Sequence, residues 1–495
     1  MTSDTKRWTA ALAGGIALVD VVLVFWLRVR PQDGLADLEL VQALVDHHST
    51  VRWHLGLWPY QIATWSLMGT SAVMPIDRAE QLLMMIVLFV QVWGLSRLLA
   101  TYGWPLVASL GVAAPVSIGF FFHAGFYEFT LGTGVAFLAL AAARNDRIVR
   151  TVVLLVVCWF CHLLPYAVAA GSLTLEQLAD QRVRSRTKVL RIGVLALPVL
   201  LFVVAAPKAQ LDGGRYEPLR RAVKIAIADS FMATFDTTER VLQSTLAAAL
   251  LSWLVVMAWR RYRRGDGVAV HGPMALGAIV IALGGVFAPP SVFNGTFLWQ
   301  RFGLYAWVFA LAALGPVIRM ADDRAHRVVG VGGLVLMVAL TVHRVPTYRQ
   351  IDRELDDIAS IGRLLEADDI VAGLHGGMLH PYAQAYPTAH AESIAARRSG
   401  ADYLSNIVTH SGIAIGTYPK GVSAAWGYPE EGYHSLAIVP TVIVTMGPVD
   451  PAVRQRLHDE GFVESGTTDG GLATAWREPT VRTEVDPDAD ANRHD

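Results

Sequence analysis

Long apolar runs alternate with short polar segments over roughly the first 342 residues, whereas the last 150 or so are polar and typical of a globular domain. Eleven of these runs approach the length of about 20 residues that a membrane-spanning helix needs. They cover residues 9–27, 80–97, 104–121, 125–143, 149–161, 163–177, 190–206, 241–259, 271–288, 303–319 and 327–342. The pattern predicts a membrane α-helical bundle of about 11 transmembrane helices over residues 1–343.

The composition supports a membrane protein. Hydrophobic residues make up 53% of the chain and charged residues only 17%, which is too little charge to cover a water-soluble protein of 495 residues. The 41 Lys and Arg balance 42 Asp and Glu, so nothing indicates a nucleic-acid partner. Cys158 and Cys161 lie in an apolar run; packed core thiols are the simpler interpretation, and redox or metal chemistry is the alternative.

The basic residues indicate the orientation of the bundle. Two basic clusters, 182–188 and 260–264, lie on the same side as the N-terminus if the ambiguous stretch 56–74 lies in or dips into the interface. If 56–74 spans instead, the basic loop 144–150 moves to the side of the long loops. The positive-inside bias favours the first arrangement, with a cytoplasmic N-terminus and with three long loops and the C-terminal domain outside. The run 9–27 is expected to remain as an uncleaved first helix.

The first outer loop, within residues 28–79, carries the candidate catalytic residues. Asp33, Asp37 and Glu39 follow the first span closely, and apolar positions recur at helical spacing over 35–44, which predicts an amphipathic helix on the membrane surface. Asp37 near its start is either a helix cap or a functional carboxylate, and Asp33 either a turn residue or part of the same cluster. A carboxylate here can act as a base on an acceptor hydroxyl, or Asp37 and Glu39 can bind a divalent cation such as Mg or Mn.

Further outer residues are candidates for substrate binding. Glu128, in the motif GFYEFTLG, lies a few residues into a span and should have a partner or face a water-filled cavity. Arg301, beside Trp299 in WQRF, can clamp a phosphate or extend to lipid headgroups. Arg220 and Arg221 make the second outer loop basic, which suits either a lipid-linked phosphate or headgroup contact.

The C-terminal region, 344–479, is expected to form an extracytoplasmic α/β domain. A polar helix at 347–366 leads to a strand at 369–374, a second buried strand lies within 436–447, and a helix and two further strands follow. This alternation suggests a small layer with a parallel core. Five of its histidines, His375, His380, His390, His410 and His434, match no established ligand spacing. Residues 480–495 read as an acidic disordered tail.

The order of these parts resembles the GT-C superfamily of membrane glycosyltransferases. The motifs GFYEFTLG, WQRF and the terminal IVTMGPVDP, GFVESG and LATAWRE look like bacterial members of that group. The resemblance implies a plasma-membrane hexosyl- or pentosyltransferase that takes a sugar from a polyprenyl-phosphate donor. The acceptor would be an extracytoplasmic glycan or lipid. It assigns the acidic pair after the first span to Asp37 and Glu39, with Asp33 as the alternative, although the adjacent Asp-Glu form of that pair is missing here.

Two rival classes remain open at this stage. A silent membrane scaffold of cell-envelope assembly would keep the fold and lose only a few side chains. A lipid or polysaccharide transporter should carry ionisable residues in mid-span on several helices, whereas the sequence shows only Asp20 clearly within a span, with Glu128 near an end.

Overall fold

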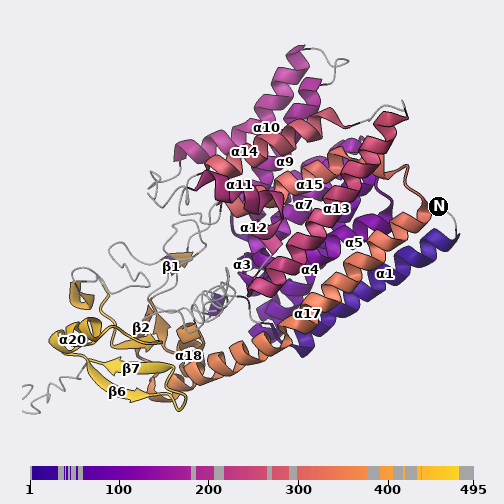
Figure 1. The fold of residues 1–495 in the computed structure, drawn as a ribbon. Helices are drawn as coiled ribbons and strands as arrows, with labels where there is room; N and C mark the ends of the chain where they lie inside the picture. Colours follow the sequence, from indigo (N-terminus) through magenta and orange to yellow (C-terminus); the bar gives the residue numbers. More distant parts are fainter. Residues whose placement is uncertain are drawn as a thin grey trace, which may run out of the picture.

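The computed structural model is mostly helical, with a mixed sheet near the C-terminus (Figure 1). It describes residues 3–29, 31, 38, 41, 42, 45, 52, 53, 59–179, 185–205, 217–232, 234–264, 270–288, 298–375, 391–404, 416, 417, 432–435 and 438–478. Asp33, Asp37 and Glu39 lie outside these ranges, as do most of the predicted interfacial helix 35–44 and the whole of 480–495.

Six helices in the described part of the chain are long and apolar enough to cross a bilayer. They run from Asp4–Trp26 (α1 with η1), Ile76–Thr101 (α4), Leu106–His123 (α5 with α6), Ser185–Val204 (in α10), Thr237–Arg263 (α13) and Asp323–Leu364 (α17 with η2). The other expected spans are also helical, with 14 to 18 residues each: α7 (Tyr127–Arg144), α8 (Ile148–Cys161), α9 (Leu163–Ala179), α14 (Gly272–Phe287) and α15 (Leu298–Ala313). The chain is thus a multi-pass membrane protein, and eleven full crossings stay a prediction.

The ambiguous stretch at 56–74 forms only a short helix, α3 (Ile62–Ser71). Its 10 residues reach about 15 Å, half of the hydrocarbon thickness of a bilayer. A helix of this length does not cross, which agrees with the placement of the stretch at the interface.

Glycines bring the central helices into direct backbone contact. A Cβ atom on Gly94 of α4 would overlap the carbonyl oxygen of Gly134 of α7, and one on Gly333 of α17 would overlap the backbone of Gly111 in α5. Small residues at such crossings let membrane helices approach closely enough for dispersion contacts to hold them, since lipid supplies no hydrophobic driving force between helices. The α4–α7 and α5–α17 pairs form the centre of the bundle.

The last span and the first helix of the C-terminal domain are one element. α17 (Asp323–Ala359) has 37 residues and runs through Pro346, so the expected separation between a span at 327–342 and a helix at 347–366 is wrong. Buried contacts hold both sides of the proline, because Arg344 pairs with Glu239 and Tyr348 bonds to His123. At about 1.5 Å per residue the helix extends well beyond a bilayer core, and Figure 1 shows it reaching from the bundle to the sheet.

The C-terminal domain contains a five-stranded sheet with the order β3-β2-β5-β7-β6. Its strands are β2 (Ile370–His375), β3 (Asp402–Tyr403), β5 (Val442–Met446), β6 (Val463–Thr467) and β7 (Ala473–Arg477). β2 and β5 are parallel, as the sequence predicted; β3, which it did not predict, is also parallel to β2, and β7 and β6 add an antiparallel edge. The helices α18 (Ala391–Ser399) and α20 (Pro451–Asp459) belong to the same domain.

The first outer loop and the C-terminal domain are joined by a small second sheet. The two-residue strand β1 (Arg52–Trp53) pairs antiparallel with β4 (Gly416–Thr417). The segment that carries the candidate carboxylates is therefore tied, through β1, to a segment more than 360 residues later in the chain.

Candidate functional site

A break between two short helices places an imidazole beside Arg301. α8 ends at Cys161, His162 has extended backbone angles (φ −167°, ψ 135°), and α9 starts at the next residue. Arg301 lies in the first turn of α15, and its Nη1 is 2.9 Å from Nε2 of His162. Both side chains are buried. The short pair of helices expected at 149–177 thus turns at a residue of the candidate site.

The motif GFYEFTLG supplies the aromatic surroundings of Arg301. Its guanidinium carbon lies 4.8 Å from the ring centroid of Phe126 and 4.9 Å from that of Phe129. A guanidinium over two ring faces is held by cation–π attraction while its N–H edges stay available for hydrogen bonds. At 7% exposed, Arg301 is enclosed by protein and does not extend to lipid headgroups. The structure therefore brings together two motifs that the sequence identified separately.

Tyr60 and Gln61, at the start of α3, complete this cluster, which we call the Arg301 cluster (Tyr60, Gln61, His162, Arg301 and the two phenylalanines). The Tyr60 ring meets the His162 ring edge to face at 4.3 Å. Gln61 is fully buried, and neither its side-chain oxygen nor its nitrogen has a partner among the described residues. Buried amides in native proteins bond to protein, water or a ligand. The sequence gave no signal for Gln61, because a lone glutamine beside an apolar run matches no motif.

Glu128 lies at the edge of the Arg301 cluster, in the first turn of α7. It is half-buried, and its negative charge interacts electrostatically with the Tyr60 hydroxyl and with the Cys161 thiol. Glu128 is not an isolated charge, since it interacts with its surroundings. This agrees with the expectation that a carboxylate so close to a span has a partner or a polar environment.

The second outer loop separates its two candidate arginines. α11 (Pro218–Ala226) buries Arg221, which donates to the carbonyl oxygen of Ala288 at the end of α14, whereas Arg220 is exposed and pairs with Glu217 at 2.9 Å. Arg221 thus anchors α11 to the bundle by satisfying a helix-terminal carbonyl.

Trp299 contacts a cation of the second loop. Lys224 lies over its ring, with Nζ 5.7 Å from the centroid, whereas the guanidinium of Arg301 lies over Phe126 and Phe129. Lys224 is also 3.7 Å from the buried carboxylate of Asp229, which Arg240 contacts at 2.7 Å. These charges tie α11 to α12 (Asp229–Met232) and α13, and they hold Lys224 over the Trp299 ring.

A further buried arginine, Arg344, was not predicted from the sequence. Arg344 and Glu239 are fully buried and paired at 2.6 Å, and Arg344 also donates to the carbonyl oxygen of Ile118 at 2.6 Å. His123 and Tyr348 bond next to this pair at 2.7 Å. The available signal was a lone arginine at the outer end of an apolar run, but nothing in the sequence relates position 344 to position 239. Both residues lie just outside the predicted spans 241–259 and 327–342, so their burial depends on how the helices pack and not on the apolar runs.

No group of three or more metal-ligating side chains occurs among the residues that the structure describes. Asp37 and Glu39, the candidate ligands, lie outside them. A divalent cation therefore stays a prediction from the sequence.

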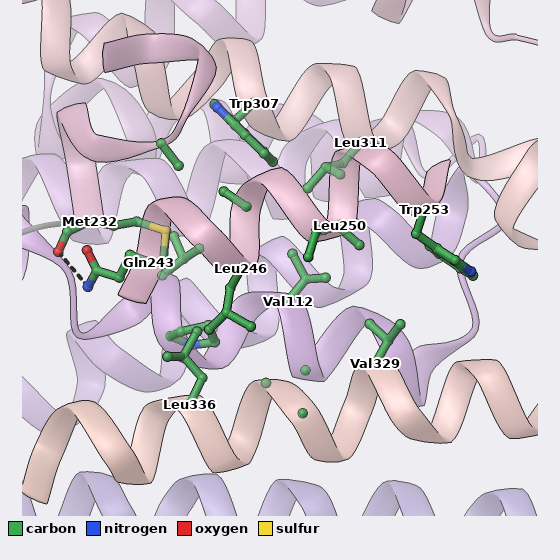
Figure 2. Close-up of a pocket in the computed structure, with 18 of the residues that line it drawn as sticks. Val112, Met232, Gln243, Leu246, Leu250, Trp253, Trp307, Leu311, Val329 and Leu336 are labelled. Atoms are coloured by element: carbon green, nitrogen blue, oxygen red, sulfur yellow. Dashed lines mark hydrogen bonds between the residues drawn. The ribbon is translucent and has the colours of Figure 1, made fainter. Parts of the chain in front are cut away.

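An apolar cavity of about 610 Å³ lies between α5, α13, α15 and α17. Figure 2 shows Trp253, Leu250 and Leu246 of α13 facing Val112 of α5 and Leu336 of α17 across it. Leu304, Val308 and Leu311 of α15 also line it. Arg301, in the first turn of the same helix, faces Phe126 and Phe129 and is not among the lining residues.

The fold is shared with a solved structure. No protein-family model matches the sequence, and no curated protein matches it. Among four matching chains of known structure is the crystal structure of ArnT from Cupriavidus metallidurans bound to undecaprenyl phosphate. It aligns with a TM-score of 0.55 and 11% sequence identity, over 96% of this chain and 98% of that one. The chain thus has the fold of ArnT, a polytopic glycosyltransferase of the GT-C type, which confirms the fold that the resemblance implied.

Proposed function

We propose that this protein is an integral membrane glycosyltransferase that transfers a sugar from a polyprenyl-phosphate donor to an extracytoplasmic glycan or lipid acceptor. The observation that carries the proposal is the fold shared with ArnT along nearly the whole of both chains, in a structure that holds undecaprenyl phosphate. Fold alone does not fix chemistry, so the site must supply the rest of the argument.

Hydrogen-bond accounting in the Arg301 cluster supports an anion there. The backbone N–H of Leu164 donates to Nδ1 of His162 at 3.0 Å, so in the neutral ring the hydrogen resides on Nε2. That Nε2–H faces Nη1 of Arg301, which is also a donor, at 2.9 Å. Two donors this close favour an acceptor between or beside them. A phosphate oxygen satisfies both, and the planar guanidinium can bind it bidentately.

The apolar cavity suits the polyprenyl chain of the same donor. It is lined mainly by apolar side chains, three of them from α15, the helix that carries Arg301 in its first turn. A lipid phosphate bound at Arg301 would place its tail along this helix, towards the apolar cavity. Arg220, Arg221 and Lys224 would contribute positive charge to donor binding, and Trp299 would hold Lys224 by a cation–π contact.

The carboxylates of the first outer loop would carry out the chemistry. Asp37 would take the proton of the acceptor hydroxyl while its oxygen attacks the anomeric carbon. The bond from that carbon to the phosphate oxygen would break, and the phosphate would leave with the electron pair, held by Arg301. A single displacement of this kind inverts the anomeric centre. Glu39 and Asp33 are the alternatives for the same role, and Asp37 with Glu39 would supply the ligands of a divalent cation, which neutralises a leaving phosphate.

Substitution of the carboxylates tests the proposal. Asp37→Asn should abolish sugar transfer while the protein still folds, because the amide keeps the shape and can still cap a helix. Glu39→Gln and Asp33→Asn are the companions, and the largest loss identifies the base. The measurement is transfer from a labelled polyprenyl-phosphate sugar in membranes, normalised to folded protein extracted in detergent.

The rival functions give different results in the same experiment. If the three single variants and the triple variant all support glycan assembly as well as the unchanged protein, the carboxylates are not catalytic. The scaffold or the transporter would then replace the glycosyltransferase. The buried ion pair of Arg344 and Glu239 does not support the transporter, because its two members bond to each other. It does not support the scaffold either, since an enzyme can contain the same pair.

A further inference from the structure

A polar cavity of about 930 Å³ lies at the end of the bundle opposite the C-terminal domain. It is formed where α4, α7, α13 and α15 end and α14 begins, next to the residues from which α17 starts towards the C-terminal domain. With a cytoplasmic N-terminus this is the cytoplasmic end. Its lining residues are Ala100, Thr101, Tyr102, Gly103, Trp104, Pro105, Arg144, Arg261, His271, Pro316, Arg319 and Met320.

The charged side chains of this cavity are all basic among the described lining residues. Arg144, Arg261 and Arg319 come from three different parts of the chain, and His271 adds an imidazole. The guanidinium of Arg144 lies over the Tyr102 ring, 5.3 Å from its centroid. Nε and Nη1 of Arg261 are buried and have no partner in the described structure. Buried guanidinium donors without partners are costly, which indicates that an acceptor belongs beside them.

The floor of the cavity is held in place by backbone contacts. The indole N–H of Trp104 donates to the carbonyl oxygen of Leu311 at 2.8 Å. The backbone N–H of His271 donates to the carbonyl oxygen of Ala313 at 3.0 Å. Gly103 adopts φ +106° at the turn between α4 and α5, and the turn packs against Gly315. The basic side chains of Arg144, Arg261 and Arg319 therefore surround a floor that is fixed by backbone contacts.

The described residues that line the cavity include no carboxylate, and one carboxylate that contacts them, Glu176, is already engaged. Glu176 of α9 accepts the hydrogen bond of the Tyr102 hydroxyl, on the ring that Arg144 covers. It orients the tyrosine and leaves Arg261 without a carboxylate partner among the described residues. The cavity thus has excess positive charge at a place where membranes present anionic headgroups.

We propose that this cavity binds the phosphate headgroup of an anionic phospholipid from the cytoplasmic leaflet. The guanidinium groups of Arg144 and Arg261 would bind the phosphate, and Arg319 would add a third positive charge to the cavity. Trp104, Pro105, Pro316 and Met320 give the same cavity an apolar wall, which suits the glycerol and acyl part of a lipid and serves no purpose for a small soluble anion. The site lies at the other end of the bundle from the Arg301 cluster, so it does not depend on the glycosyltransferase activity.

Lipid binding to the purified full-length chain tests the inference. The protein is stripped of lipid in detergent and titrated with dioleoyl phosphatidylglycerol or with dioleoyl phosphatidylcholine, and native mass spectrometry counts the bound molecules. The anionic lipid should bind the more tightly. The double variant Arg144→Gln/Arg261→Gln should bind it about tenfold or more weakly, the usual effect of losing hydrogen bonds to a charged group.

Arg260→Gln is the matched control, because Arg260 is exposed, belongs to the same basic cluster and does not line the cavity. It should change the affinity by less than about twofold, as expected for general surface charge. Equal losses in the control and the double variant would overturn the proposal, and so would no loss in either. If inorganic phosphate at millimolar concentration displaces the lipid completely, the cavity is a soluble-anion site and the lipid assignment fails. Should the double variant not fold, Arg144→Lys/Arg261→Lys replaces it, and unchanged binding there would contradict a role of the guanidinium fork.

Discussion

Two buried arginines at the outer half of the bundle have opposite environments. Arg344 bonds to both carboxylate oxygens of Glu239, to the carbonyl oxygen of Ile118 and to the hydroxyl of Thr234, so acceptors fill its donor edge. Arg301 lies on the faces of two phenylalanine rings, and its polar contacts include an imidazole nitrogen whose ring has its other nitrogen occupied.

This difference separates a structural role from a binding role. A guanidinium whose hydrogen bonds end on protein acceptors holds helices together, here α13, α5 and α17, and has little to offer a ligand. A guanidinium that rests on aromatic faces and has an imidazole N–H beside it offers two kinds of donor to an anion. The same residue type, with similar burial, is therefore expected to respond differently to substitution at the two places.

The largest expected effect is on stability at the Arg344 pair. Glu239→Gln keeps the shape of the side chain and leaves the Arg344 charge buried without its counter-ion. We expect the free energy of unfolding to fall by about 3–5 kcal/mol, measured by denaturant unfolding of the purified protein in detergent. Glu217→Gln is the control, because its partner Arg220 is exposed and the loss there should stay below about 1 kcal/mol. Similar losses in both variants would mean that the buried pair is not a structural clasp.

The next effect concerns donor binding at Arg301. Arg301→Ala should weaken the binding of a polyprenyl-phosphate ligand by roughly 1.5–3 kcal/mol, the usual loss for a hydrogen bond to a charged group. Arg301→Lys should recover only part of it, because an ammonium cannot reproduce the planar fork. Isothermal titration in detergent gives both values, and Arg363→Gln, an exposed arginine of the C-terminal domain, serves as the control. Unchanged affinity in both Arg301 variants would remove the binding role of this residue.

The smallest effect isolates the second donor of the Arg301 cluster. His162→Phe keeps an aromatic ring against Tyr60 and Phe129 but removes the Nε2–H. The affinity for the same lipid phosphate should fall by about 0.5–1.5 kcal/mol, as for a single neutral hydrogen bond. The double variant with Arg301→Ala should lose less than the sum of the two single losses, since both donors serve one anion. Full additivity would place the imidazole outside the anion site.

Much of the fold could be predicted from the chain because membrane helices are specified locally. The hydrocarbon core demands an apolar segment for every helix that crosses it, so the runs over 1–343 predicted helices that the structure contains. The parallel strands β2 and β5 were also expected, since short buried β-branched runs between helices are typical of such a layer. The continuity of α17 was not expected, because the buried partners that keep its helix intact on both sides of Pro346 are far away in sequence.

The sequence by itself determined that this is a multi-pass membrane protein with an α/β domain at its C-terminal end, and it identified Arg301 and the motif around Glu128 as candidates. Only the tertiary structure decided that Arg301 lies on Phe126 and Phe129 beside His162. The cation–π contact of Lys224 with Trp299 and the ion pair of Arg344 with Glu239 also follow from the tertiary structure alone. The physical reason is the range of the interactions. Hydropathy acts on consecutive residues and can be read along the chain, whereas the partner of a buried charge is set by how helices more than 100 residues apart pack together.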